Sequence, residues 1–156
     1  MKVENSLLGA AGEYLVLSRL LSRGYLAAPA PRGTRKVDIL VNHIDGGAPS
    51  LIQVKTTQKG IKAGWVMGEK NEKAIDDDLF YCLVDFRPEN PTVHVIPSKV
   101  VAETLSENHQ IWLDTPGRNG QEHQATNMRV LGPKNYTKPD NWLDEYLENW
   151  DVLPGV

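Results

Sequence analysis

The spacing of apolar positions predicts helices and strands in mixed order along the chain. Residues 5–22 carry apolar side chains at helical spacing, with Asn5 or Ser6 as the N-cap and Gly24 as the glycine that ends the helix. The apolar arc of this helix is wide, so we expect it to pack against a sheet. Short apolar or alternating runs then predict strands at 25–28, 36–42, 51–57, 79–86 and 92–96, and a brief extended piece at 64–67.

Turn and capping residues predict how these elements are connected. The sequence Asp45-Gly46-Gly47 favours a turn, so residues 37–57 are expected to form an antiparallel hairpin. A short helix is expected at 69–75, and a longer one from Pro97 or Ser98 to about residue 107. Residues 110–139 are expected to be irregular, and residues 142–150 to form a closing helix with an aromatic stripe anchored in the core. The fold class is therefore α/β, with a mixed central sheet that contains a hairpin and is flanked by helices.

Composition limits the class of protein. The chain has 156 residues, 40% hydrophobic and 24% charged, which is typical of one globular domain and excludes disordered, collagen-like and coiled-coil classes. Cys82 is the single cysteine, so no internal disulfide is possible, and we expect a cytoplasmic protein. We expect no membrane span, because no apolar run approaches about 20 residues. A GxGxxG sequence after a strand and a Walker loop are both absent, which argues against a nucleotide cofactor.

Charge is distributed unevenly. The net charge is −3, yet residues 32–73 carry eight basic and four acidic side chains, whereas residues 137–156 carry one basic and five acidic side chains. This asymmetry indicates a side that faces a polyanion. The alternative is chance clustering on a solvated surface.

Four polar residues in apolar surroundings are candidates for chemistry. Asp38 lies within the apolar hairpin arm, and alternation along 51–57 puts Gln53, Lys55 and Thr57 on one face. Carboxylate and amide oxygens are ligands for Mg²⁺ or Mn²⁺, and a nearby lysine can stabilise charge on a phosphoryl oxygen. Glu13 of the first helix is the natural third oxygen donor, after Asp38 and Gln53. Together they favour metal-assisted hydrolysis of a phosphodiester.

At these residues the sequence resembles the PD-(D/E)xK nuclease superfamily. The matching segments are Gly12-Glu13, Gly24-Tyr25, Val37 to Leu40 and Ile52 to Lys55; the helix Glu is similar to Holliday-junction resolvases, and the Gln-x-Lys ending to Mrr-type endonucleases. The resemblance implies a restriction-endonuclease-like core at about 5–107, within a single domain 1–156 whose extension, 108–156, it does not explain. It also implies that the metal ligands are Asp38, Gln53, the backbone carbonyl of Val54, and Glu13, with Lys55 as the catalytic lysine.

Two departures and one alternative accompany the resemblance. Gln53 replaces the commoner carboxylate, which removes a negative charge and should weaken metal affinity, and the proline that normally precedes the aspartate is absent. Asp38 and Lys55 could instead form a cross-strand ion pair, and Glu13 could pair with Arg19.

The expected function is a Mg²⁺- or Mn²⁺-dependent DNA endonuclease, with possible homodimerisation and no small-molecule cofactor. A catalytically weak nuclease-fold module that binds nucleic acid or a protein is the alternative, and an immunity or assembly protein is a third. Trp65 could stack on a base, although a core position is favoured. The candidate phosphate contacts, each of which could also be a solvated surface residue, are Arg32, Arg35, Lys36, Thr57, Lys59 and Lys62.

Overall fold

Two helices and seven strands follow one another along residues 2–154, the part of the chain that the computed structural model describes. The helices are α1 (Asn5–Ser22) and α2 (Ser98–Asp114). The strands are β1 (Tyr25–Pro29), β2 (Ile39–His43), β3 (Ser50–Thr57), β4 (Trp65–Gly68), β5 (Leu79–Asp85), β6 (Thr92–Pro97) and β7 (Met128–Leu131). Short 3₁₀ turns lie at Ile61–Ala63, Glu69–Glu72, Asp144–Tyr146 and Trp150–Val152.

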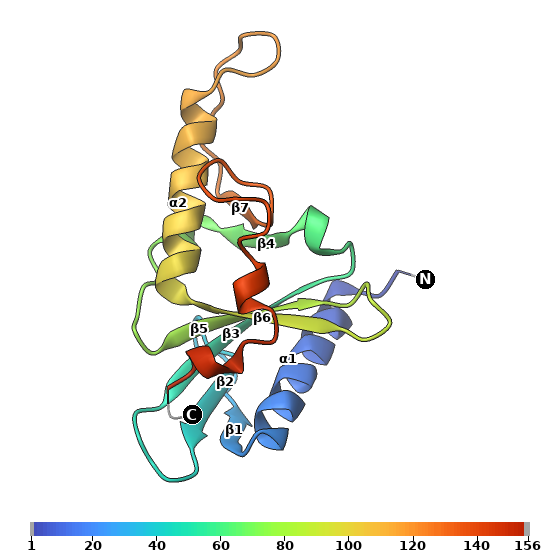
Figure 1. Cartoon of the computed structure of the whole chain (residues 1–156). Coiled ribbons are helices and arrows are strands. Elements are labelled where there is room, and N and C mark those ends of the chain that lie inside the picture. Colours follow the sequence, from blue (N-terminus) through green and yellow to red (C-terminus); the bar gives the residue numbers. More distant parts are fainter. Residues whose placement is uncertain (1, 155–156) are drawn as a thin grey trace.

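A five-stranded sheet in the order β1-β2-β3-β5-β6 forms the centre of the molecule (Figure 1). Strands β1, β2 and β3 are antiparallel neighbours, β3 and β5 are parallel, and β5 and β6 are antiparallel. β4 and β7 form a separate two-stranded antiparallel sheet. The predicted α/β class, mixed sheet and hairpin are therefore confirmed.

Two hydrophobic cores lie on the two faces of the large sheet. Because side chains alternate along a strand, β5 sends Phe80, Cys82 and Val84 into the core that α1 covers. Tyr81 and Leu83 enter the other core, with α2, β4 and β7. Every residue of β5 is buried, as its continuous apolar run predicts for a strand covered on both faces.

The predicted closing helix at 142–150 is wrong. This segment forms turns and two 3₁₀ turns, and Glu148 adopts a left-handed backbone conformation with φ of 51°. Trp142 packs into the α2-side core, whereas Trp150 packs into the α1-side core. The segment crosses the edge of the sheet at β6, where the Glu148 N–H donates to the Val93 carbonyl at 2.7 Å. A straight helix could not reach both cores, so the aromatic spacing was misleading.

Several element boundaries also differ from the sequence predictions. α1 has Glu4 at its N-cap with no side-chain cap hydrogen bond, so neither Asn5 nor Ser6 caps it. β2 begins at Ile39 rather than at residue 36, and the helix expected at 69–75 is a 3₁₀ turn over Glu69–Glu72. α2 continues to Asp114, and β7 forms within the segment expected to be irregular. β7 could not be predicted from its own residues, since it forms by pairing with β4, which is distant in sequence. Neither helix is long and apolar enough to cross a membrane in the described part of the chain.

Candidate functional site

Asp38 lies directly before β2 and is fixed from both sides. Its N–H donates to the Ile52 carbonyl and its own carbonyl accepts from the Ala30 N–H, each at 2.8 Å. Its carboxylate Oδ2 accepts from the Val54 N–H at 2.7 Å. The carboxylate thus takes the place of a main-chain acceptor where the β2–β3 pairing ends. This gives Asp38 one well-defined position beside β3.

Gln53 carries a buried oxygen with no partner. The residue is only 7% exposed, and its Oε1 makes no hydrogen bond to any residue that the structure describes. An unsatisfied buried polar atom costs about 1–3 kcal/mol, so such an atom in a native fold calls for an explanation. A hard cation beside Asp38 would satisfy this oxygen, and the donor chemistry therefore fits Mg²⁺ or Mn²⁺.

Glu13 is an exposed residue of α1, and the helix lies close to the sheet at its neighbour Gly12. A Cβ at Gly12 would collide with Cγ2 of Thr56, so only glycine allows α1 to lie this close to β3. Partial burial raises the pKa of the Glu13 carboxyl, and the negative charge of Asp38 raises it further. The two carboxylates therefore repel each other, and a divalent cation between them would relieve that repulsion.

Lys55 lies on β3 two residues after Gln53 and is half-buried. Burial lowers the pKa of its ammonium, Lys70 lowers it further, and Asp38 acts in the opposite direction. Within residues 2–154, no ion pair joins Asp38 to Lys55, and Arg19 pairs with Glu148 rather than with Glu13. Both alternative ion pairs are therefore absent from the described structure.

Sequence reasoning did not single out Lys70, whose charge helps to lower the pKa of Lys55. It lies on the 3₁₀ turn Glu69–Glu72, which the buried Asn71 anchors: Asn71 Oδ1 accepts from the Gly68 N–H at 2.8 Å, and Nδ2 donates to the Tyr81 hydroxyl at 2.9 Å. Glu72 also pairs with Arg129 of β7. Lys70 belongs to the basic segment 32–73, but only this long-range anchoring brings it near Lys55.

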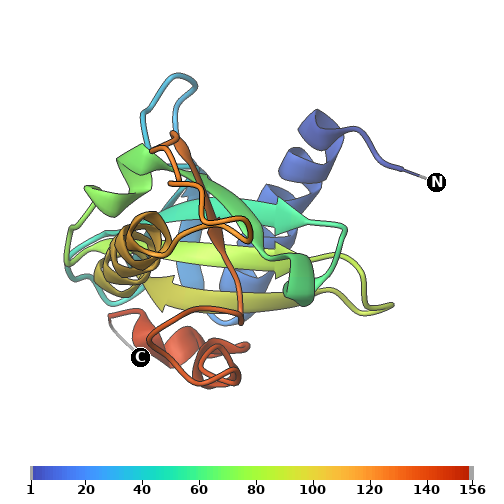
Figure 2. The same cartoon turned by 90° about the horizontal axis from the view of Figure 1, so that it is seen from above.

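The predicted phosphate contacts fall into three groups. Arg32, Arg35 and Lys36 are exposed on the loop between β1 and β2. Figure 2 shows this loop (light blue) beside the 3₁₀ turn at 69–72, and Arg35 and Lys36 line a depression of 220 Å³ together with Lys73.

Lys59 and Lys62 are exposed after the end of β3. Thr57, by contrast, is 7% exposed, and its hydroxyl accepts from the Lys59 N–H at 3.2 Å. Its hydroxyl is thus used within the turn. Trp65 is fully buried and donates from Nε1 to the Val84 carbonyl at 2.9 Å, so it is a core residue and not a base-stacking platform.

The site has few acidic groups. No cluster of three or more His, Cys, Asp or Glu side chains suited to a metal occurs in the described residues. The oxygen donors that the hairpin and α1 offer are the carboxylates of Asp38 and Glu13, the amide oxygen of Gln53 and the main chain of β3. Among the sequence-predicted residues, Asp38 hydrogen-bonds to Val54, and its charge acts on Glu13 and on Lys55. Lys59 and Lys62 lie further along the chain.

Comparisons with known proteins identify the fold. No protein-family model matches the chain, and no curated protein matches it. Among solved structures, the bacterial homing endonuclease I-Ssp6803I is similar, with a TM-score of 0.58 over 97% of this chain and 91% of that chain, at 16% sequence identity. The likeness is one of fold. It supports the endonuclease-like architecture of the central sheet and its flanking helices.

Proposed function

We propose that this protein is a divalent-metal-dependent endonuclease that hydrolyses phosphodiester bonds in DNA, and that it belongs to the PD-(D/E)xK superfamily. The observation that carries the proposal is the unpartnered, buried Oε1 of Gln53, a residue whose two chain neighbours, Ile52 and Val54, both hydrogen-bond to Asp38. The fold that the chain shares with a homing endonuclease supports it independently.

The metal ligands in this proposal are Asp38, Gln53, the carbonyl of Val54, and Glu13. A bound Mg²⁺ or Mn²⁺ would supply Lewis-acid stabilisation of the charge that develops on the phosphate. Asp38 keeps its orientation through the Val54 N–H, so it needs no rearrangement to act as a ligand. Glu13 completes the acidic side of the site, and the close contact of Gly12 with β3 sets its position.

Lys55 acts on the reacting groups in this proposal. Lys55 follows Gln53 by two residues on the same strand. Its ammonium can donate a hydrogen bond to a phosphate oxygen or orient the attacking water. Lys70, on the neighbouring turn, adds positive charge. It also lowers the pKa of Lys55, so Lys55 loses its proton more readily. Both lysines favour the approach of a phosphodiester.

DNA would lie along the basic loops around this site. Arg32, Arg35, Lys36, Lys59 and Lys62 are exposed and available for phosphate contacts, and Lys73 lines the same depression as Arg35. We propose that the chain acts as one domain in the cytoplasm. A homodimer remains a prediction, on the ground that cutting two strands needs two sites.

The test is cleavage of plasmid and branched DNA with Mg²⁺ or Mn²⁺. We expect the wild type to cut and Asp38→Asn and Lys55→Gln each to lose at least about a hundredfold in rate, the scale of a lost catalytic group. Lys99→Gln is a matched control, since Lys99 is exposed on α2 and, within residues 2–154, its ion pairing is limited to a long pair with Glu103. Equal cleavage by all four proteins would refute the assigned site.

A second function has its own supporting observation. Gln53 in place of a carboxylate, together with the absence of a three-residue acidic or histidine cluster in the described chain, favours a module that binds nucleic acid or a protein without cutting. Nucleic-acid binding of this kind would persist in EDTA and weaken steeply with salt, while no metal would induce cleavage.

A further inference from the structure

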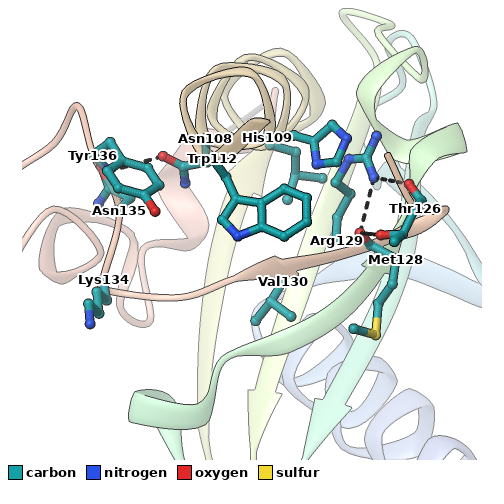
Figure 3. Close-up of a pocket in the computed structure, with 11 residues that line it drawn as sticks. Asn108, His109, Trp112, Thr126, Met128, Arg129, Val130, Lys134, Asn135 and Tyr136 are labelled. Carbon is teal, nitrogen blue, oxygen red and sulfur yellow. Dashed lines mark hydrogen bonds between the residues drawn. The ribbon is translucent and has the colours of Figure 1, made fainter. Parts of the chain in front are cut away.

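A cleft between α2 and β7 lies outside the candidate site. It encloses 530 Å³, and none of its lining residues is among the proposed metal or lysine groups. Figure 3 shows the Trp112 indole hanging from α2 above Val130 of β7, with Tyr136 at one end of the cleft and His109 and Arg129 at the other. A cleft of this size accommodates a nucleobase with its sugar.

The aromatic wall of the cleft is rigid. The Trp112 ring stacks on His123 with centroids 4.1 Å apart and planes 5° apart, and on His109 at 5.6 Å and 24°. His123 Nδ1 also lies 2.7 Å from the Trp112 carbonyl oxygen. The indole is therefore held in place before any ligand arrives. Its Nε1–H donates to no residue in the described part of the chain, so this donor is free for a ligand.

Tyr136 offers a second flat surface. It is 56% exposed, and its backbone is fixed because its N–H donates to Asn108 Oδ1 at 3.1 Å. An exposed aromatic ring on a fixed backbone is a stacking platform that accepts any base. The apolar floor, with Met128 and Val130 of β7, suits the same kind of planar ligand.

The charged side chains that line the cleft are basic. No Asp or Glu is found among its lining residues within 2–154, although the whole chain carries a net charge of −3. Arg129 is paired with Glu72, whereas Lys134 is exposed and has no ion pair in that same range. A flat apolar group joined to an anion is the chemistry of a nucleotide unit.

We propose that this cleft binds unpaired nucleotides of single-stranded DNA. A base stacks on Tyr136 and accepts a hydrogen bond from Trp112 Nε1, and Lys134 contacts a backbone phosphate. The inference rests on the proposed function only in taking DNA as the polymer. It adds that the DNA presents a single-stranded segment, which the cleft holds at a distance from the cutting site.

The experiment titrates wild-type protein into a fluorescent eight-residue thymidine oligonucleotide in EDTA and follows anisotropy. An abasic strand of equal length and charge is the comparison ligand. We expect Tyr136→Phe to bind the oligonucleotide like the wild type and Tyr136→Leu to bind about tenfold more weakly, since leucine keeps apolar surface but cannot stack. Lys134→Gln should flatten the slope of log affinity against log salt by about 0.7, and Lys99→Gln should leave it unchanged.

Three results would overturn the inference: no binding of the oligonucleotide, equal affinity for the abasic strand, or equal affinity of Tyr136→Leu and the wild type. The last result would mean that the oligonucleotide binds elsewhere on the protein, as expected if the cleft binds a protein partner instead. Because the titration contains no metal and scores no cleavage, a failure of the proposed nuclease activity leaves it unaffected. Conversely, metal-dependent cutting that requires Asp38 would stand even if the cleft bound no single strand.

Discussion

At the residue scale, the amide of Gln53 limits how strongly the site can hold a divalent cation. The amide oxygen is a ligand of suitable type, but it brings no charge. Gln53→Glu would add a third carboxylate to the proposed ligand set, which already contains those of Asp38 and Glu13. Because Mg²⁺ affinity rises with the number of charged oxygen ligands, we expect the dissociation constant for Mg²⁺ to fall by about tenfold, measured by isothermal titration calorimetry.

Gln124→Glu is the matched control for this change. Gln124 is exposed in the segment between α2 and β7, so the variant adds the same charge to the chain away from the hairpin. We expect its Mg²⁺ affinity to equal that of the wild type. If both variants bind Mg²⁺ with the same affinity, position 53 is not a ligand.

Individual site residues differ in how far the sequence could place them. Strand alternation and the hairpin turn were enough to place Asp38 beside β3, where it hydrogen-bonds to Ile52 and Val54, because both signals act within twenty residues of chain. Lys70 was not predictable, since its position depends on Asn71 reaching Tyr81 of another strand. The missing partner of Gln53 Oε1 is also a property of the packed structure alone.

At the element scale, the close contact of α1 with β3 affects both the stability of the fold and the candidate site, because Glu13 follows Gly12 on α1. Gly12→Ala would drive its new methyl into Cγ2 of Thr56 and push α1 away from the sheet. We expect this overpacking to lower the free energy of unfolding by about 1–3 kcal/mol, measured by urea denaturation. Mg²⁺ affinity should fall as well, because Glu13 moves with the helix.

Two further variants separate the collision from the general effect of alanine. Nothing lies within 4 Å of a Cβ at Gly9, so Gly9→Ala should stabilise the protein by up to about 1 kcal/mol through better helix propensity. Thr56→Ser removes the obstructing methyl, and in the double variant it should recover much of the loss. A Gly12→Ala protein as stable as Gly9→Ala would show that α1 can move away freely.

Elements were predictable where a local pattern decides them. α1, the hairpin and β5 follow from helical spacing, a turn sequence and a continuous apolar run, and all three form as expected. The segment 142–150 was mispredicted because helical spacing of Trp142 and Trp150 also suits a chain that sends one ring to each core. β7 was missed because four residues become a strand only beside β4.

At the scale of the whole molecule, the two cores lie on opposite faces of the sheet, and the C-terminal segment ties them together. Glu148 is the centre of this connection. Its Oε1 accepts from Arg19 of α1 and, at 2.9 Å, from the Val93 N–H of β6, while Oε2 accepts from Trp150 Nε1 at 3.0 Å. One carboxylate therefore links α1, the edge strand and the last turn of the described chain.

This connection makes stability depend on pH. Burial raises the pKa of Glu148, but hydrogen bonds from Trp150, Arg19 and Val93 outweigh it, so the folded-state pKa is lowered. A lowered pKa means that the stabilisation is present above the unfolded value, about 4.3, and is lost as the pH falls through the folded value. Glu148→Gln should therefore reduce the free energy of unfolding at pH 7 by about 1–3 kcal/mol.

The difference between Glu148→Gln and the wild type should shrink as the pH falls below about 4.3, because the wild-type carboxyl becomes protonated progressively in the unfolded and then in the folded state. Urea denaturation from pH 3 to pH 7 measures it. Glu145→Gln is the control, since Glu145 is exposed on the same segment and should leave the curve unchanged. A difference that stays constant over this range would mean that Glu148 acts through packing and hydrogen-bond geometry, and that its charge does not hold the two cores together.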